Sequence, residues 1–352
     1  MDKRQEILRQ LRQAGGHLSG QQLSEALGVS RTAVWKIIKR LKEEGYPIEA
    51  VTNKGYRLLS VEGRDLFNRE ELENSLATRW AGHPLIFLEQ TGSTNADIFR
   101  LSEEGYPEGT MVVTSAQTAG KGRRGRVWIS PSDVNVYMSI LLKPDFRPET
   151  APMLTLLMAL SIVKACEELY CGDAGSAGNS NDSGRTDCRF GIKWPNDVVA
   201  RRGEGPYRKI CGILTEMRLE EKEIRDIVIG TGMNVNQTSF AEEIRETAGS
   251  IALTVGHPVS RSELTAKVWQ YFEEDFDKFA RTQTFEPLRE DYERVLVNRG
   301  RKVRVLDPQA PFEGTALGIT PMGELIVRAD DGSGDREVGT GEVSVRGVMG
   351  YV

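Results

Sequence analysis

One loop holds the largest concentration of residues suited to chemistry in this sequence. Between residues 120 and 126, four cations are interspersed with three glycines: Lys121, Arg123, Arg124 and Arg126, with Gly120, Gly122 and Gly125. Glycine lets backbone N–H groups approach an anion closely, and the cations neutralise phosphate or carboxylate charge. The composition of this loop therefore predicts that it binds an anionic ligand.

The same residues match the G-x-G-x-x-G pattern of dinucleotide-binding folds, but the chain around them does not. A predicted strand at residues 111–115 precedes the glycines. A Rossmann turn must then open a helix whose N-terminus faces the pyrophosphate, whereas residues 127–131 have an extended pattern. A phosphate loop needs Ser or Thr after its lysine, and here Gly122 follows Lys121. Neither nucleotide-binding fold fits.

Further motifs follow one another in a definite order along the chain. They are Ser93-Thr94-Asn95 before the loop, Trp128 after it, Lys193-Trp194-Pro195-Asn196-Asp197, Lys209 ahead of Gly212-Ile213-Leu214, and Gly230-Thr231-Gly232-Met233-Asn234-Val235-Asn236. In this order the motifs resemble those of biotin–protein ligases. Together with the basic head described below, the resemblance spans essentially the whole chain and is to the bifunctional biotin ligases that are also biotin-operon repressors.

The resemblance implies a two-step reaction. Biotin and ATP would form biotinyl-5′-AMP and pyrophosphate, and biotin would then pass to a lysine of a biotin carboxyl-carrier protein. The biotin-binding residues implied by the family are Ser93, Thr94, Asn95, Gln117, Lys121, Gly122, Arg123 and Lys209. The implied nucleotide-binding residues are Arg123, Arg124, Trp128, Asn196, Asp197 and Asn234.

Three cations are implied as catalytic residues: Lys193, Lys209 and Arg123. Attack of a carboxylate on a phosphoryl group brings two anions together and develops charge at phosphorus. Fixed cations and amides must offset that repulsion, because the protein need not form a covalent intermediate. We expect Mg²⁺ to accompany the nucleotide phosphates and expect no metal site built from protein ligands.

Two other functions remain compatible with these motifs. A lipoate or octanoate ligase shares the fold class, although the basic loop and the Lys193–Asp197 motif favour biotin. A ligand-sensing repressor without catalysis would use the cationic loop only to bind its effector. In addition, Lys121 stands where the family's loop usually has arginine, so that a point charge replaces a planar, bidentate group.

The first 60 residues differ in charge from the rest of the chain, which suggests a separate head. They contain 11 basic and 6 acidic residues, against 35 and 45 in the remainder. Apolar residues recur at helical spacing in three segments, and Ser30 can cap the third helix, residues 31–44. A glycine turn followed by a helix with a basic outer face is typical of a helix-turn-helix, and such a head is suited to a polyanion.

The head therefore predicts contact with operator DNA. Residues 47–51 and 56–58 form a predicted hairpin, the wing. The expected DNA-binding residues are Ser30, Arg31, Thr32, Lys36, Lys39, Arg40 and Lys54. Arg31 and Thr32 lie where they can reach base edges, while the other cations neutralise phosphates. For Trp35 two interpretations stay open: packing against the first helix, the commoner place for an aromatic residue there, and contact with DNA. A two-fold operator would be bound by a homodimer that forms when biotinyl-5′-AMP is bound.

The whole chain is predicted to be an α+β protein of three domains. These are a winged helix-turn-helix (residues 1–62), a mixed α/β ligase domain of the biotin/lipoate type (63–298) and an SH3-like β-barrel (299–352). Helices are expected near residues 71–80, 149–169, 262–280 and 285–297. In residues 172–186, 11 of 15 are Gly, Ser, Asn or Asp, which predicts a flexible surface insertion.

Composition favours a cytoplasmic globular protein over a secreted or membrane protein. Of 352 residues, 39% are hydrophobic and 28% charged. The longest apolar stretch, residues 151–166, is interrupted by Lys164 and is too short for a membrane span, and no apolar signal follows the N-terminus. The four cysteines form no C-x-x-C pair and are expected to be reduced thiols, with Cys171 and Cys188 near each other.

Overall fold

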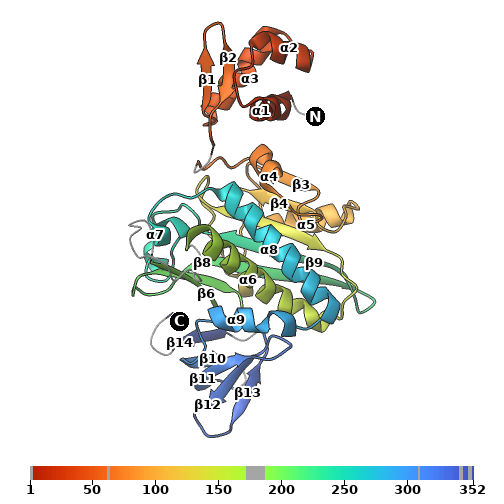
Figure 1. The fold of residues 1–352 in the computed structure, drawn as a ribbon. Helices are drawn as coiled ribbons and strands as arrows, with labels where there is room; N and C mark the ends of the chain where they lie inside the picture. Colours follow the sequence, from red (N-terminus) through yellow and green to blue (C-terminus); the bar gives the residue numbers. More distant parts are fainter. Residues whose placement is uncertain (1–2, 62–63, 172–186, 308–309, 341–343, 348–350) are drawn as a thin grey trace. The chain divides into compact units, whose positions relative to one another are not determined.

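The computed structural model describes residues 3–61, 64–171, 187–307, 310–340, 344–347 and 351–352 (Figure 1). The chain divides into two compact units, Met1–Asn74 and Ser75–Val352. The insertion predicted at residues 172–186 lies outside the described residues. At its two borders, the thiols of Cys171 and Cys188 are free, with their Sγ atoms 2.9 Å apart, so the predicted proximity is confirmed.

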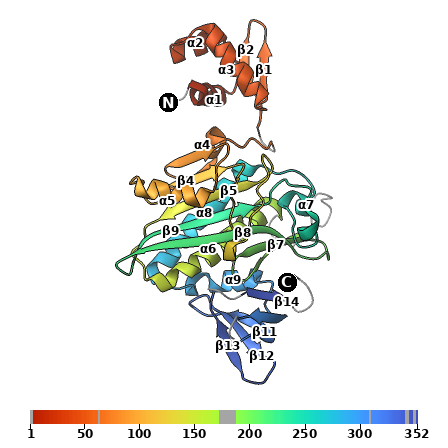
Figure 2. The same cartoon turned by 180° about the vertical axis from the view of Figure 1, so that it is seen from behind.

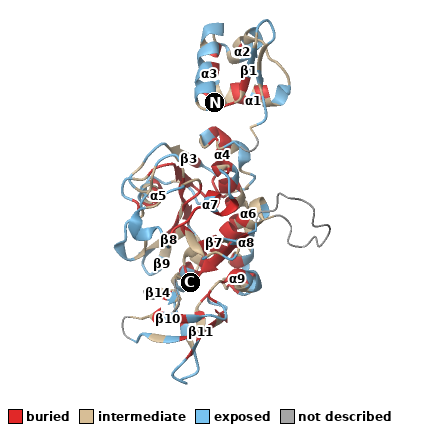
Figure 3. Cartoon of the chain, turned by 90° about the vertical axis from the view of Figure 1, so that its left-hand side faces the viewer, coloured by how far each residue is buried: buried red, intermediate tan, exposed pale blue. Residues whose placement is uncertain are grey.

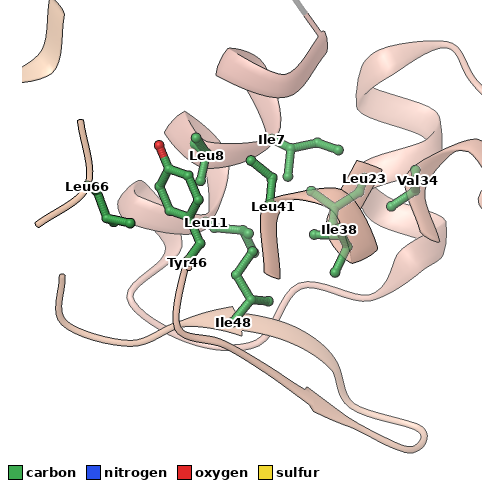
Figure 4. Close-up of a cluster of buried hydrophobic side chains, with 10 residues drawn as sticks. All are labelled: Ile7, Leu8, Leu11, Leu23, Val34, Ile38, Leu41, Tyr46, Ile48 and Leu66. Atoms are coloured by element: carbon green, nitrogen blue, oxygen red, sulfur yellow. The ribbon is translucent and has the colours of Figure 1, made fainter. Parts of the chain in front are cut away.

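The N-terminal unit is a winged helix-turn-helix, as predicted. Helices α1 (Lys3–Ala14), α2 (Gly20–Leu27) and α3 (Arg31–Glu43) precede the two antiparallel strands of the wing, β1 (Ile48–Val51) and β2 (Gly55–Leu58). Ser19 and Gln22 form a capping box at α2, and Ser30 Oγ accepts the N–H of Ala33 at α3. The helices bury one apolar core (Figure 4): Ile7, Leu8, Leu11, Leu23, Val34, Ile38, Leu41, Tyr46, Ile48 and Leu66.

Glycine is required where the wing meets the helices. Gly55 has φ +104°, and a Cβ there would lie 2.1 Å from the carbonyl oxygen of Leu18. The same close approach lets Leu18 and Tyr56 exchange two backbone hydrogen bonds of 2.8 Å. The wing is therefore held to the α1–α2 segment by main-chain contacts, which a side chain at residue 55 would disrupt.

Helix α4 (Arg69–Ser75) belongs to the N-terminal unit, so this unit extends beyond the boundary predicted at residue 62. Asn68 caps α4, since its Oδ1 accepts the N–H of Glu71 at 3.0 Å. Gln5 of α1 donates to Glu73 at 2.7 Å, and Arg12 forms an ion pair with Glu71. These contacts attach α4 to α1.

Helix α4 also ends earlier than predicted, at Ser75 instead of near residue 80. The carboxylate of Glu273, on α8 (Arg261–Thr282), accepts hydrogen bonds from the backbone N–H groups of residues 79, 80 and 81. These N–H groups therefore have hydrogen-bond partners without being in a helix, so extending α4 through residues 79–81 would add no hydrogen bonds for them.

The larger unit is built on a seven-stranded sheet in the order β3-β4-β5-β9-β8-β7-β6. Only the β3–β4 pair is parallel among the described pairings of this sheet. The strands are β3 (Leu85–Leu88), β4 (Met111–Thr114), β5 (Val136–Leu142), β6 (Cys188–Lys193), β7 (Asp197–Arg202), β8 (Arg208–Glu220) and β9 (Glu223–Met233). Antiparallel pairing places the ends of distant strands side by side, which is what assembles the site described below.

Helices cover both faces of this sheet. On the face nearer the viewer in Figure 1, α6 (Ala151–Tyr170) packs with α8, and Thr155 of α6 hydrogen-bonds Thr215 at 2.8 Å. Helix α5 (Thr94–Glu103) lies on the opposite face, seen in Figure 2, where Asn95 Nδ2 donates to Glu216 at 2.6 Å. Thr215 and Glu216 are adjacent in β8 and so point to opposite faces.

Helix α6 is the core helix of this unit. The segment Pro148–Tyr170 is long and apolar enough to cross a membrane by length and composition, but 78% of its most apolar window is buried inside the fold. Its buried residues belong to the interior coloured red in Figure 3. Its apolar composition is accounted for by packing between the sheet and α8.

The C-terminal part of the larger unit is a small β domain, as predicted. Its five-stranded antiparallel sheet has the order β13-β12-β11-β10-β14, comprising β10 (Lys302–Leu306), β11 (Phe312–Ile319), β12 (Leu325–Ala329), β13 (Asp335–Val338) and β14 (Ser344–Gly347). Before it, the helix predicted at residues 285–297 is a 3-10 turn at Glu286–Leu288 followed by α9 (Arg289–Val295). A further short helix, α7 (Ile251–Val255), follows β9.

Candidate active site and nucleic-acid interface

A cavity with about 510 Å³ of empty space lies on the α5 face of the sheet. Of its sixteen described lining residues three are cations and none is acidic: Ser93, Thr94, Asn95, Gln117, Lys121, Gly122, Arg123, Trp128, Asn196, Lys209, Gly212, Ile213, Leu214, Gly230, Thr231 and Gly232. A cavity with this lining favours an anionic ligand.

Three glycines of β8 and β9 form the floor of the cavity. A Cβ on Gly230 would lie 2.0 Å from Asn95 Oδ1, and one on Gly232 would lie 2.5 Å from Trp128 Nε1. At Gly212 a Cβ would meet both Trp128 Cζ3 at 2.9 Å and Lys209 Nζ at 3.1 Å. The absence of side chains at these positions lets the functional groups lie directly against the sheet.

Hydroxyl and amide groups gather at the N-terminus of α5. Thr94 donates from its N–H (2.9 Å) and its Oγ1 (3.2 Å) to Gln117 Oε1. Ser139 Oγ, on β5, lies 2.7 Å from Thr94 Oγ1 and 2.6 Å from Asn95 Oδ1. Ser93 is the N-cap residue, but its side chain makes no capping hydrogen bond. The network therefore fixes the side-chain amides of Asn95 and Gln117. Ser93 lines the cavity, and its hydroxyl is not used to cap the helix.

The glycine-rich basic loop is a small hairpin. Gly122 N–H donates to the Arg126 carbonyl at 2.7 Å and Trp128 N–H donates to the Gly120 carbonyl at 2.9 Å. At its tip, the Arg123 guanidinium donates to Asn196 Oδ1 at 3.1 Å and to the carbonyl oxygen of Thr340 at 2.8 Å. Burial lowers the pKa of Arg123 from its ordinary value. The loop is thus tied to the β6–β7 turn and to the C-terminal β domain by one side chain.

Two lysines share one carboxylate beside the cavity. Lys209 Nζ lies 2.5 Å from Asp197 Oδ1 and 5.2 Å from the centre of the Trp128 ring. Lys193 Nζ lies 3.9 Å from Asp197 Oδ2 and 4.0 Å from the centre of the Tyr351 ring. The Tyr351 hydroxyl donates to Asp197 Oδ2 at 2.6 Å.

Burial and charge act in opposite directions in this group. Burial lowers the pKa of Lys193 to about 8, with Asp197 opposing the shift and Lys209 adding to it. Burial works to raise the pKa of Asp197, but the two ammonium groups outweigh it and hold that pKa below its usual value. Asp197 is therefore ionised at neutral pH, and Lys193 is close to losing its proton.

Most of the residues expected in the site converge. Ten of them line the cavity: Ser93, Thr94, Asn95, Gln117, Lys121, Gly122, Arg123, Trp128, Asn196 and Lys209. Lys193 and Asp197 adjoin it through the Lys209 ion pair.

Two residues expected to bind nucleotide lie elsewhere. Arg124 is exposed at the tip of the loop with φ +58°, a backbone turn that directs it differently from Arg123. Asn234 is buried, where its Nδ2 donates to the Gly249 carbonyl at 3.1 Å. The structure thus gives Asn234 a structural bond to a neighbouring loop and leaves Arg124 outside the cavity lining.

The sequence reasoning missed the residues that come from distant parts of the chain. Ser139 lies in an apolar strand, and its only signal was a polar residue at a buried position. Thr340 and Tyr351 belong to the C-terminal domain, 143 and more residues beyond Asp197 in the sequence. For the cavity floor a signal did exist, since Gly230 and Gly232 alternate with the period of a strand and leave one face without side chains.

The head presents a basic face on α3. The buried side of this helix consists of Val34, Ile38 and Leu41. The exposed residues include six of those expected to bind DNA: Arg31, Thr32, Lys36, Lys39, Arg40 and, on the wing, Lys54. Ser30 uses its hydroxyl as the cap of α3. Arg40 pairs with Glu44 at 3.1 Å, at the edge of this face.

Of the two interpretations of Trp35, burial against the first helix is wrong. Its side chain is 52% exposed, and Lys39 Nζ lies 5.6 Å from the centre of its ring. The physical reason is helical spacing, because Trp35 lies four residues after Arg31 and four before Lys39, on the polar side of α3.

Comparison with known proteins decides the family. Residues 3–57 match the HTH domain, residues 87–234 match the biotin/lipoate A/B protein ligase family, and residues 300–346 match the biotin protein ligase C terminal domain. The bifunctional ligase/repressor BirA of Bacillus subtilis (strain 168) is 36% identical over 96% of this chain and 98% of that relative. The chain belongs to the family of bifunctional biotin ligases and repressors.

Other members of the ligase family support this assignment. The biotin–[acetyl-CoA-carboxylase] ligase of Paracoccus denitrificans is 28% identical over 70% of this chain and 94% of that relative. A solved biotin protein ligase from Aquifex aeolicus, in complex with biotin and ATP, is 29% identical with a TM-score of 0.59, over 74% of this chain and 98% of that one. The predicted fold class and the predicted ligase and repressor family are confirmed.

Proposed function

We propose that the larger unit of this protein joins biotin to ATP, forming biotinyl-5′-AMP and pyrophosphate, and then transfers biotin to a carrier lysine. The observation that carries this proposal is the cavity itself. It places Lys121, Arg123 and Lys209 over a glycine floor with no acidic side chain among its described lining residues. A site of this charge suits the meeting of a carboxylate and a phosphoryl group.

The uncharged end of the cavity is suited to the ring system of biotin. Ser93, Thr94, Asn95 and Gln117 offer hydroxyl and amide groups there. The ureido group of biotin has both N–H donors and a carbonyl acceptor, and it needs partners of both kinds. Because Gln117 is already bonded to Thr94, its amide is preorganised for such a ligand.

The charged end is suited to the reacting centre. Lys209 and Lys193 flank Asp197, which holds both ammonium groups next to the cavity. We assign these lysines to the biotin carboxylate and the α-phosphate, where they offset repulsion and stabilise the developing charge. Arg123 closes the loop over the acyl-phosphate, and the Trp128 ring, beside Lys209, provides a wall for the adenine.

Mg²⁺ enters the proposal as a companion of the nucleotide. The described lining of the cavity provides no carboxylate ligand for it, and Asp197 is already engaged by Lys209 and Tyr351. The contribution of the protein to charge neutralisation therefore comes from its own cations. The acceptor class we propose is the biotin carrier of a carboxylase, and the cytoplasm, where ATP and chromosomal DNA occur, is the corresponding location.

Biotin-dependent release of pyrophosphate tests this activity. The protein is incubated with ATP and Mg²⁺ together with biotin, lipoate or octanoate, and pyrophosphate is followed in each case. We expect release with biotin only, and labelling of a biotin carrier domain when it is added. Release with lipoate or octanoate in preference to biotin contradicts the substrate, and no release with any acid contradicts the ligase activity.

We further propose that α3 and the wing bind operator DNA, with Trp35 as part of the contacting face. Replacing Lys36 and Lys39 by alanine should weaken binding and reduce the salt dependence of log K by about two units of slope, roughly 0.9 for each lost phosphate contact. Arg9→Ala, which removes an exposed cation of α1 paired with Glu6, is the matched control. Titrations at several salt concentrations measure the slopes, and an unchanged slope contradicts phosphate contact by these lysines.

Regulation requires that DNA affinity depend on the ligand. We propose that biotinyl-5′-AMP, more than biotin, promotes a homodimer whose paired heads bind a two-fold operator. Linkage requires that a ligand which binds the dimer more tightly than the monomer raise the association constant by the ratio of these two affinities. Sedimentation with no ligand, with biotin and with a non-hydrolysable adenylate should give the tightest dimer with the adenylate. Equal association constants contradict this regulation.

The two functions should separate when the chain is cut at the boundary of its compact units. A fragment lacking residues 1–74 should retain most adenylate synthesis and lose operator binding, because each unit has its own core. A fragment lacking only residues 1–62 retains α4 without α1, and exposes the surface that Gln5 and Arg12 cover. Melting temperature and pyrophosphate release compare the two fragments. Loss of ligase activity in a folded 75–352 fragment contradicts independent units.

A further inference from the structure

The geometry points to Tyr351, in the last two residues of the sequence, as a positioning residue of the adenylation site. Its hydroxyl fixes the carboxylate of Asp197 and its ring covers the ammonium of Lys193. This inference rests on the proposed function, because it concerns how the two lysines of the ligase site are held. It gives the C-terminal domain a defined part in the chemistry.

Asp197 is held from three sides. Lys209 takes Oδ1 at 2.5 Å, while Oδ2 accepts from the Tyr351 hydroxyl at 2.6 Å and lies 3.9 Å from Lys193 Nζ. The carboxylate is therefore oriented with one oxygen toward each lysine. A carboxylate that accepts a hydroxyl at such a distance forms a strong, charge-assisted hydrogen bond.

Burial keeps the Tyr351 hydroxyl protonated, so that it can donate to Asp197. The pKa of Tyr351 is raised well above its ordinary value, first by burial and then by the negative charge of Asp197. The hydroxyl thus remains protonated while Asp197 remains ionised. Its bond to Oδ2 holds the carboxylate in the orientation that directs Oδ1 to Lys209 and Oδ2 toward Lys193.

The ring has a second role at Lys193. The lysine side chain is only 8% exposed, and the ring lies 4.0 Å from its Nζ. The charged groups that face this ammonium are Asp197, Lys209, Arg346 and Arg126. By covering the ammonium, the ring maintains the low solvent exposure that depresses its pKa, while the π face compensates part of the lost hydration.

A second contact joins the C-terminal domain to the same site. The carbonyl oxygen of Thr340 accepts from the Arg123 guanidinium at 2.8 Å. The domain thus contacts the basic loop through Thr340 and the paired lysines through Tyr351. Arg123 also contacts Asn196, in the turn between β6 and β7, and Tyr351 contacts Asp197, the first residue of β7. This arrangement is what a positioning role for the domain requires.

Tyr351→Phe tests the hydroxyl. We expect kcat for biotin-dependent pyrophosphate release to fall about tenfold, while KM for biotin changes less than twofold, because the hydroxyl acts on the reacting centre and not on the ring pocket. Tyr271→Phe is the matched control, since its hydroxyl donates to Glu168 on the far side of the sheet, between α8 and α6. Melting temperatures of both variants establish that they are folded.

Tyr351→Ala tests the ring through the pH profile. In the unaltered protein kcat/KM should fall as the pH rises through about 8, where Lys193 of the free enzyme loses its proton. Removing the ring admits water to the ammonium, so the falling limb should move to higher pH, whereas Tyr351→Phe leaves it in place. A loss of packing alone does not move this limb.

The outcomes separate this inference from the proposed function. If the unaltered protein releases no pyrophosphate, the proposed function is wrong. If it is active, either a Tyr351→Phe variant with unaltered kcat or a Tyr351→Ala variant with an unmoved limb overturns the positioning role of Tyr351.

Discussion

Lys209→Ala should slow the formation of biotinyl-5′-AMP by about 10² to 10³-fold, the usual effect of removing one preorganised group that stabilises developing charge. Lys209 is the cation that both lines the cavity and pairs with Asp197. Its loss also leaves the Asp197 carboxylate beside the incoming carboxylate and phosphate with one neutralising partner fewer. Repulsion therefore rises in the transition state, where the two reacting anions are closest.

A single-turnover measurement of pyrophosphate release at saturating biotin and ATP isolates this step. Lys278→Ala is the matched control, because Lys278 also pairs with an aspartate, Asp275, at 3.0 Å but lies on α8, away from the cavity. The control should retain the unaltered rate. A Lys209→Ala variant with the same rate as Lys278→Ala contradicts the assignment of Lys209 to the reacting centre.

Arg123→Ala should act on retention of the intermediate more than on its synthesis. The guanidinium is the side chain that ties the loop to Asn196 and to the Thr340 carbonyl. A charge-assisted hydrogen bond of this kind is worth about 1.5–3 kcal/mol, which corresponds to roughly tenfold to a hundredfold in affinity. The loop should then open more often over bound biotinyl-5′-AMP, and the mixed anhydride should escape into solution.

Leakage is measured by biotin transfer to exposed lysines of an unrelated protein such as albumin, alongside pyrophosphate release. Arg124→Ala provides a stringent control, since Arg124 is adjacent, exposed and outside the cavity lining. We expect strong labelling of albumin with Arg123→Ala and background labelling with Arg124→Ala. Full retention by Arg123→Ala shows that the loop is not a lid. Lys209→Ala should show the opposite pattern, slow synthesis with little leakage.

The local features of the fold were predictable because short-range rules determine them. Helix α3 has apolar residues at helical spacing and a serine cap, and both appear in the structure. The loop at residues 120–126 carries its chemistry in consecutive residues, so composition alone pointed to it. By contrast, Arg123 and Arg124 are equivalent in sequence, and only a left-handed backbone at Arg124 separates their roles.

The features that were not predictable depend on long-range packing. The end of α4 at Ser75 is determined by Glu273, nearly 200 residues away, whose carboxylate takes the backbone donors that a longer helix would use. The type of residue at position 35 leaves two interpretations open, because an aromatic side chain can pack on a neighbouring helix or contact DNA, and its exposed place on the polar side of α3 excludes the first. Thr340 and Tyr351 reach the site only through the docking of the C-terminal domain, for which no local pattern exists.

The glycine floor has a consequence for attempts to change what the ligase accepts. Even a methyl group at Gly230 or Gly232 would collide with Asn95 or Trp128, and at Gly212 with Trp128 as well. Substitution at these positions therefore requires Asn95, Trp128 or Lys209 to move, so the sheet is a poor place at which to reshape the pocket. Engineered variants that accept bulkier biotin analogues should carry their changes at the start of α5 and in the basic loop, the two walls that can recede without a steric clash at the sheet.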